Sequence, residues 1–203
     1  MRSRFILAAI TATAIGAATA GPVLADADDW VGPPDELPQA QHGKVQDLDF
    51  LFGALKVAPD ETSAKAIEQR IWAHWVISRS DTTNLLMSRV KTAIDGKDLT
   101  LALSLLDAVV ELDPTYVEGW NRRATVHYMR KEFGQAMTDI RRVLALEPRH
   151  FGALMGLGLI LQEIGDDKEA LDAFRKVLAV NPHMQKVPDM VKTLSEKIDG
   201  RDI

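Results

Sequence analysis

Hydrophobic residues recur at helical spacing along most of the chain, and the pattern is clearest in residues 151–184. Two apolar stripes, separated by a Gly-Asp-Asp break, repeat there at intervals of three and four positions, which is typical of amphipathic helices. The stripes consist of Leu154, Leu157, Gly158 and Leu161, then Ala170, Leu171, Phe174, Val177 and Leu178. Asn181-Pro182 follows, and proline disfavours helix in the residue before it. The pattern predicts two helices joined by a short turn.

The same pattern recurs along the chain with a 34-residue period. Pro114, Pro148 and Pro182 are evenly spaced at this period, with an alanine twelve positions before each and a valine five positions before each. The in-phase columns include Ala102/Ala136/Ala170, Val109/Val143/Val177 and Leu106/Ile140/Phe174. Stacking is expected because a single hairpin cannot bury both of its apolar stripes. We therefore expect an all-α solenoid with about three clear hairpin repeats, at 83–116, 117–150 and 151–184.

Weaker helical patterns flank the three repeats. Residues 185–203 predict a capping helix with one solvated side. Residues 45–82 predict a helix pair, which is either a degenerate fourth repeat or a cap. Trp72 and Trp75 lie in this pair, and tryptophans at such spacing are more often buried in a core than part of a ligand site.

The beginning of the chain predicts export. Arg2 and Arg4 precede an uncharged, Ala-rich run that ends in small residues. This pattern predicts a signal peptide over 1–25, cleaved after Ala25 or after Ala20. The alternative is that the run is kept as a membrane anchor, because its uncharged stretch from Phe5 to Ala25 is long enough to span a bilayer. We expect cleavage, a periplasmic location and no stable membrane insertion afterwards.

Residues 26–44 predict an acidic flexible tether. They contain three prolines, two glycines and five acids, which leaves little apolar surface to bury. Trp30 lies in this segment, and its side chain either docks on the fold or is exposed; we expect it to be exposed.

Composition narrows the classes of function. The chain contains no cysteine, which excludes disulfides and thiolate metal sites. Its formal net charge is −5. Removal of residues 1–25 would take away two arginines and no acid, leaving 22 basic against 29 acidic residues, a net charge of −7. An acidic protein of this kind is not a general nucleic-acid binder.

Catalytic and metal motifs are missing from the sequence. No two of the five histidines have the spacing of a zinc-binding His-Glu-x-x-His motif. His127 lies on an apolar stripe, where a packed residue is more common than a ligand, and His150 and His183 follow prolines without neighbouring acids. We expect no enzyme activity, no catalytic or metal-ligating residue and no cofactor.

The 34-residue period, the helix–turn–helix pattern, Trp120, Phe133, Ala136 and the three prolines resemble the tetratricopeptide repeat (TPR) family. The resemblance covers 83–184 strongly and 45–82 weakly. It implies a curved solenoid whose concave groove is lined by the first helix of each hairpin, with protein or peptide partners bound there. The implied function is a non-catalytic binding scaffold or adaptor. The alternative is a structural subunit that forms a homo-oligomer or belongs to a fixed envelope complex.

The resemblance also assigns residues to the groove. They are Met87, Lys91, Asn121, Arg122, Thr125, Tyr128, Met155, Gly156, Leu159 and Gln162. One branch of the family holds a partner's terminal carboxylate with a clamp of basic and amide side chains. Only Lys91 and Arg122 are basic among the five matching positions here, which argues against that binding mode.

Two glycines stand out within the groove. Gly152 and Gly156 are four positions apart and therefore share one helix face. They either leave a bare strip that a ligand can approach closely or permit tight helix packing. In the first case, the neighbouring side chains favour a ligand with an apolar anchor and a nearby carboxylate, which Arg122 and Lys91 would hold.

Residues 117–150 contain seven bases against four acids. This excess is either a docking surface for an acidic partner or an anionic envelope surface, or an ordinary solvated helix face. Within it, Arg123 faces the partner helix of its hairpin, and we expect it to form an ion pair with Asp139.

Overall fold

The computed structural model describes residues 30–34 and 47–200, which form nine α-helices and no β-strand. The helices are α1 (Leu48–Lys56), α2 (Glu61–Val76), α3 (Asp81–Asp95), α4 (Leu99–Leu112), α5 (Val117–Met129), α6 (Phe133–Leu146), α7 (Phe151–Glu163), α8 (Asp167–Val180) and α9 (Val187–Asp199). The predicted all-α class is confirmed. The predicted signal peptide lies outside the described residues. Within the described ones, no helix combines the length and the apolar character that a bilayer span requires.

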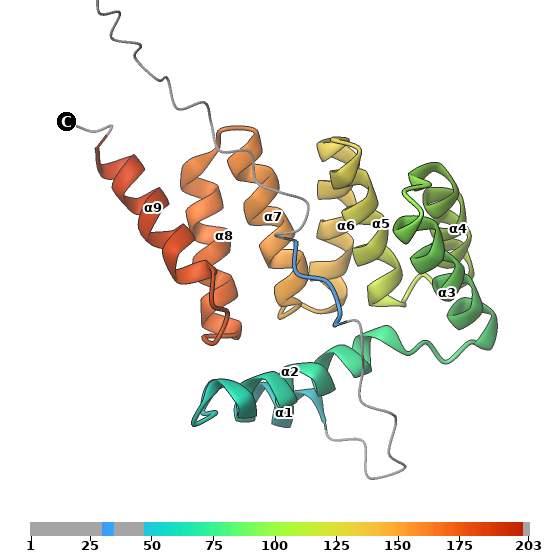
Figure 1. Ribbon diagram of the computed structural model, residues 1–203, viewed down its shortest axis with the longest axis horizontal. Coiled ribbons are helices and arrows are strands. Elements are labelled where there is room, and N and C mark those ends of the chain that lie inside the picture. Colours follow the sequence, from blue (N-terminus) through green and yellow to red (C-terminus); the bar gives the residue numbers. More distant parts are fainter. Residues whose placement is uncertain (1–29, 35–46, 201–203) are drawn as a thin grey trace, which may run out of the picture.

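Helices α3 to α8 form three hairpins that stand side by side, and α9 packs against α8 at the end of the row (Figure 1). The turn inside each hairpin has the same backbone geometry. Lys97, Lys131 and Gly165 occupy the same position in successive repeats and have positive φ angles of 59°, 59° and 84°. This left-handed conformation ends the first helix and is easiest for glycine. In two of the turns, Asp98 and Asp166 then cap the second helix by accepting a backbone hydrogen bond.

The core between the helices depends on small residues at repeated positions. Ala102, Ala136 and Ala170 are fully buried. A Cβ on Gly158 would lie only 2.4 Å from the ring of Phe174, so this glycine permits α7 and α8 to pack tightly.

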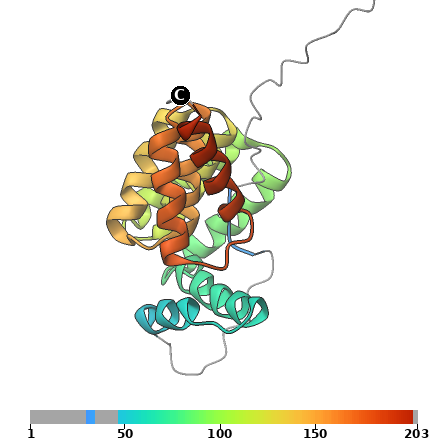
Figure 2. The ribbon, with the colours of Figure 1, turned by 90° about the vertical axis from the view of Figure 1, so that its left-hand side faces the viewer.

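The N-terminal pair α1 and α2 lies at one end of the hairpins, crosswise to their helices (Figures 1 and 2). Trp72 and Trp75 of α2 are buried, as predicted, and contact the rings of His150 and Phe151 at the start of α7. Tyr116, just before α5, donates a hydrogen bond from its hydroxyl to the Val76 carbonyl at the end of α2. Helix α2 therefore covers the N-terminal ends of α5 and α7.

Candidate functional site: the concave groove

Residues 30–34 lie against the groove helices α5 and α7 (blue segment in Figure 1). The Trp30 side chain is only 6% exposed and belongs to the main hydrophobic core. The expectation that Trp30 is exposed is therefore wrong. The acidic and proline-rich composition of 26–44 suggested that nothing there is buried, but one tryptophan provides a large apolar surface on its own.

The glycines of α7 make room for this segment. A Cβ on Gly156 would lie 2.3 Å from atoms of the Trp30 ring, so the indole rests directly on the helix backbone. A Cβ on Gly152 would lie 2.7 Å from the Val31 carbonyl oxygen and 2.9 Å from the Trp72 ring. Gly156 fits the close approach of a polypeptide segment, whereas Gly152 also permits tight packing of α2 through Trp72, so the strip combines the two interpretations. The segment is part of the same chain.

Several predicted groove residues surround the segment. The ring centroids of Tyr128 and Trp30 are 5.4 Å apart with the planes tilted by 50°. Met155 is buried beside Val31 at a neighbouring cavity. A Cβ on Gly32 would lie 3.6 Å from Nη1 of Arg122. Tyr128, Gly156 and Arg122, from two different helices, thus meet one continuous stretch of backbone.

The other predicted groove residues have different surroundings. Leu159 is fully buried in the core, and the Gln162 side-chain oxygen is buried without a hydrogen-bond partner in the described structure. Thr125 donates its hydroxyl hydrogen bond to the Asn121 carbonyl of its own helix. On α3, Met87 is half-buried and Lys91 is exposed and paired with Asp95.

A buried polar cluster lies at the N-terminal ends of α5 and α7. Glu118 accepts hydrogen bonds from Asn121 Nδ2 at 3.0 Å and from Arg122 Nε at 2.8 Å. His150 Nε2 lies 3.6 Å from Glu118 Oε2, and His150 Nδ1 accepts the Ala153 backbone hydrogen bond that caps α7. His150 Nε2 is buried without a hydrogen-bond partner in the described structure, so its approach to Glu118 is a close contact and not a hydrogen bond.

The sequence prediction that His150 has no neighbouring acid is wrong. His150 and Glu118 are far apart in the sequence, and the stacking of two hairpins brings them together. The repeat register could have indicated this proximity. Glu118 is the equivalent of Gly152 one repeat earlier, on the same concave strip. A stacked repeat places such positions next to each other.

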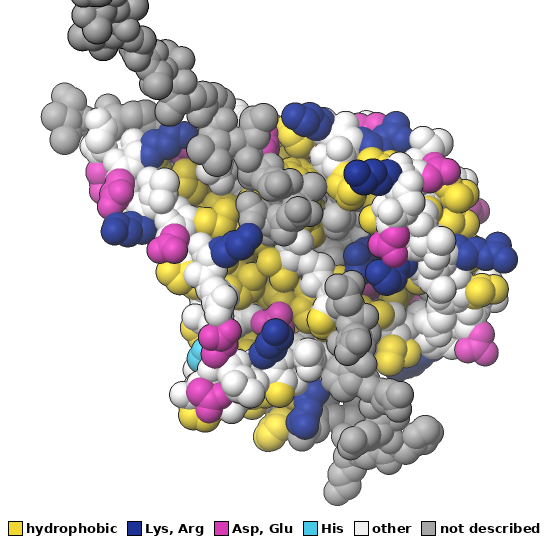
Figure 3. Space-filling view, in the orientation of Figure 1, with side chains coloured by type: hydrophobic (Ala, Val, Ile, Leu, Met, Phe, Trp, Pro, Cys, Tyr) yellow, Lys and Arg dark blue, Asp and Glu magenta, His cyan; other side chains and the backbone are white. Residues whose placement is uncertain are grey.

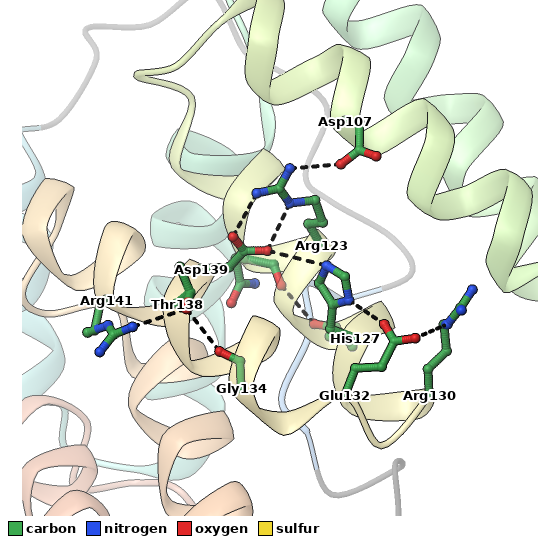
Figure 4. Close-up of polar contacts among 11 residues, drawn as sticks. Asp107, Arg123, His127, Arg130, Glu132, Gly134, Thr138, Asp139 and Arg141 are labelled. Atoms are coloured by element: carbon green, nitrogen blue, oxygen red, sulfur yellow. Dashed lines mark hydrogen bonds and ion pairs between the residues drawn. The ribbon is translucent and has the colours of Figure 1, made fainter.

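The predicted Arg123–Asp139 ion pair is confirmed (Figure 4). Arg123 donates two hydrogen bonds to Asp139, at 2.9 and 2.8 Å, and a third to Asp107 of α4 at 2.8 Å. The hydrogen bonds to Asp139 raise the pKa of the Arg123 guanidinium above its usual value. This cluster ties α4, α5 and α6 together.

Other charges of 117–150 are also paired. His127, predicted to be packed in the core, is partly exposed and forms a 2.7 Å hydrogen bond with Glu132, which lowers the pKa of the Glu132 carboxyl. Arg130 also binds Glu132, and Arg149 binds Glu147 and Asp49. These pairs fit a solvated helix face better than a docking surface for an acidic partner.

The groove continues into a cavity of about 300 Å³ between α2, the groove segment and the loop before α9. Its lining includes Val31, Glu61, Lys65, Glu68, Met155, His183 and Lys186. Hydrophobic side chains gather near the centre of this face of the molecule (Figure 3). In the described part of the chain, no three His, Asp or Glu side chains converge in a metal-binding arrangement.

The comparisons with known proteins agree with this geometry. A family model described as tetratricopeptide repeat matches residues 151–184. A TPR repeat-containing protein of Rhizobium etli is 40% identical over 161 residues, which is 79% of each chain. The first TPR of Spaghetti (RPAP3), solved with the HSP90 peptide SRMEEVD, has a TM-score of 0.57 at 18% identity and covers 59% of this chain and 95% of its own. The crystal structure of MamA protein has a TM-score of 0.54 at 21% identity, over 75% of this chain and 81% of its own.

Proposed function

The chain belongs to the tetratricopeptide repeat family, and from this premise we propose that it is a non-catalytic scaffold that binds a protein or peptide partner in its concave groove. One observation supports this most strongly. The groove accommodates an extended polypeptide, residues 30–34, with a tryptophan side chain seated on the bare backbone of Gly156. A groove that fits one extended segment fits others of similar chemistry.

The groove chemistry favours an apolar anchor on the partner. The matched structures include TPR domains solved with HSP90 and Hsp70 peptides. At three of the five clamp positions used by one branch of the family, this chain has Met87, Gly152 and Gly156. Arg122 already binds the buried Glu118 through Nε. We therefore propose recognition through a buried aromatic or aliphatic side chain, with Arg122 as a secondary contact for a carboxylate.

The proposed place of action is the periplasm, where the protein would serve as an adaptor. Arg2, Arg4 and the uncharged run that follows support this proposal. Its test is the mass of the chain isolated from the periplasmic fraction. A mass lacking residues 1–25 or 1–20 is expected, and an intact chain found only in membranes would contradict it.

A structural subunit is the second candidate. The free end of the hairpin row exposes large apolar side chains on α3 and α4, where Leu85 is 58%, Leu101 48% and Leu112 61% exposed. Exposed apolar surface of this kind can pack against a second copy or a fixed complex.

Site-specific photocrosslinking in the native host tests the groove. The photoreactive residue replaces Thr125, half-buried on α5, and the control position is Lys192, exposed on α9. A discrete adduct with another protein from position 125 and none from position 192 is the expected result. An adduct with twice the mass of the chain would favour the structural subunit, and adducts from position 192 alone would contradict the groove as the binding surface.

A further inference from the structure

Residues 30–34 follow a path along the groove in which each residue meets a particular partner. The larger ring of the Trp30 indole lies over Gly156 with atoms Cζ2, Cη2 and Cε2 nearest to it, and Tyr128 forms a side wall. Val31 places its carbonyl over Gly152, and Gly32 passes the Arg122 guanidinium. The subsite at Gly156 therefore fits a planar ring that lies flat on the glycine backbone. An aliphatic side chain would fill this subsite less completely.

Among the described residues, the contacts that join the segment to the helices are packing contacts. No hydrogen bond or ion pair in the described structure joins residues 30–34 to the helices. The Trp30 indole N–H is buried without a hydrogen-bond partner there. A buried donor without a partner opposes burial, and a ligand that satisfied it would bind better. The occupant of the subsite is thus well matched in shape and poorly matched in polarity.

The covalent connection keeps the segment at the groove. Residues 35–46 join the segment to α1, so the segment is always near the groove, at an effective concentration on the order of millimolar. Pro33 and Pro34 favour the extended backbone that the groove requires and so reduce the entropy lost on binding. A partner in solution has to displace the segment before it can use the same subsite.

Resting on the proposed function, we infer that residues 30–34 are a built-in competitor for the groove. The partner is an extended polypeptide that places a tryptophan between Tyr128 and Gly156, where Trp30 now lies. Binding of the partner releases residues 30–34, and the open groove is the binding-competent state. The measured affinity for a partner is then lower than the intrinsic affinity of the groove.

A labelled peptide of residues 26–36 provides the probe. Its binding is measured by fluorescence anisotropy to the chain as isolated from cells and to the Trp30→Ala chain. We expect the Trp30→Ala chain to bind the peptide at least tenfold more tightly, and a peptide with alanine in place of tryptophan not to bind. Equal affinity for both chains, or no binding to the Trp30→Ala chain, would overturn the inference.

Matched glycine substitutions locate the subsite. In the Trp30→Ala chain, Gly156→Ala adds a methyl group where the ring would lie, whereas nothing lies within 4 Å of a Cβ on Gly134 of α6. Both changes favour helix, so the fold is retained, which circular dichroism checks. Gly156→Ala should weaken peptide binding at least tenfold and Gly134→Ala should leave it unchanged. Equal effects of the two substitutions would contradict the subsite.

Crosslinking from position 125 separates this inference from the proposed function. A partner captured more efficiently by the Trp30→Ala chain supports the competitor. Equal capture by both chains overturns the competitor and leaves the proposed function standing, whereas capture by neither overturns both. A dimer that dissociates on Trp30→Ala substitution would place the segment in the groove of a second copy, and so contradict the intramolecular arrangement.

Discussion

Helices α3 and α7 occupy equivalent places in their hairpins, but their concave faces differ in side-chain type and in burial. On α3 this face includes half-buried Met87 and exposed Ser88 and Lys91. Their equivalents on α7 are Met155, Gly156 and Leu159, all buried. The backbone fold is the same, so the difference comes from the side chains and from what covers them.

Two other parts of the chain cover the concave face of α7. Residues 30–34 lie over the middle of α7, and Trp72 and Trp75 of α2 lie over its first turn. Glycines at 152 and 156 make α7 a receptive surface, whereas Asn84 and Ser88 occupy those positions on α3. The groove therefore has a filled half at α7 and an open half at α3. In the mechanism that we propose, a partner meets the open half first and reaches the filled half by displacing residues 30–34.

Removing the Trp72 side chain, which covers the first turn of α7, should cause the largest loss of stability. Trp72→Ala leaves a cavity between α2 and α7, because the ring is fully buried against His150 and Phe151. We expect a loss of about 3–5 kcal/mol in the free energy of unfolding, measured by urea denaturation. Val57→Ala, at a position 79% exposed, is the control and should change it by less than about 0.5 kcal/mol. A loss below about 1 kcal/mol for Trp72→Ala would show that α2 does not pack on α7.

Breaking the Arg123–Asp139 ion pair, which helps to tie α4, α5 and α6 together, should cause the next largest loss of stability. Asp139 is buried and accepts two hydrogen bonds from Arg123, which also binds Asp107 of α4. Asp139→Ala should lower the free energy of unfolding by about 2–3 kcal/mol, because it leaves a partly buried guanidinium without its main partner. Asp95→Ala, which breaks an exposed pair with Lys91, should cost about 0.5 kcal/mol or less. Equal effects of the two substitutions would contradict a structural role for the Arg123–Asp139 pair.

Releasing residues 30–34 should expose α7 to solvent while lowering the stability of the fold only slightly. Trp30→Ala removes a large buried apolar surface, but the segment regains conformational freedom, so we expect a net loss of only about 1–2 kcal/mol. Hydrogen–deuterium exchange should rise in α7 and stay unchanged in α3. An increase spread evenly over both helices would indicate general destabilisation rather than an opened groove.

The pH dependence of stability gives the smallest expected effect. Burial raises the pKa of the Tyr116 hydroxyl well above its ordinary value of about 10. The folded state therefore keeps this group neutral, and its contribution is fully present below about pH 10. Above that pH the unfolded chain loses the proton first, so stability falls as pH rises.

Tyr116→Phe isolates this contribution. Urea denaturation at pH 8 and at pH 10.5 should show a smaller alkaline loss for the variant than for the unsubstituted chain. The variant should also be less stable at pH 8 by about 1 kcal/mol, because the hydrogen bond to Val76 is missing. An identical alkaline loss in both chains would show that Tyr116 is not the group responsible.

The hairpins and their contacts were predictable from sequence because they depend on local periodicity. The repeat register gave the stripes of α7 and α8 and, through the facing positions of one hairpin, the Arg123–Asp139 pair. The burial of Trp72 and Trp75 followed from their residue type and spacing. These features involve neighbours in the chain or positions related by the 34-residue period.

The occupied groove was not predictable in the same way. Trp30 and Gly156 are far apart in the sequence, and no periodicity relates a segment outside the repeats to a position within them. Composition predicted an exposed Trp30, because average polarity hides a single large apolar side chain. The sequence features that indicated the contact were the isolated tryptophan and the Gly152–Gly156 strip. Only the folded structure shows that Trp30 packs on Gly156.

The most direct test of the filled groove is to replace Trp30 with the photoreactive aromatic residue p-benzoylphenylalanine, irradiate the isolated chain and map the crosslinks by mass spectrometry. The account predicts crosslinks within one chain, to the stretches of α5 and α7 that contain Tyr128 and Gly156. Crosslinks to α3 or α9 instead, or none within the chain, would contradict it.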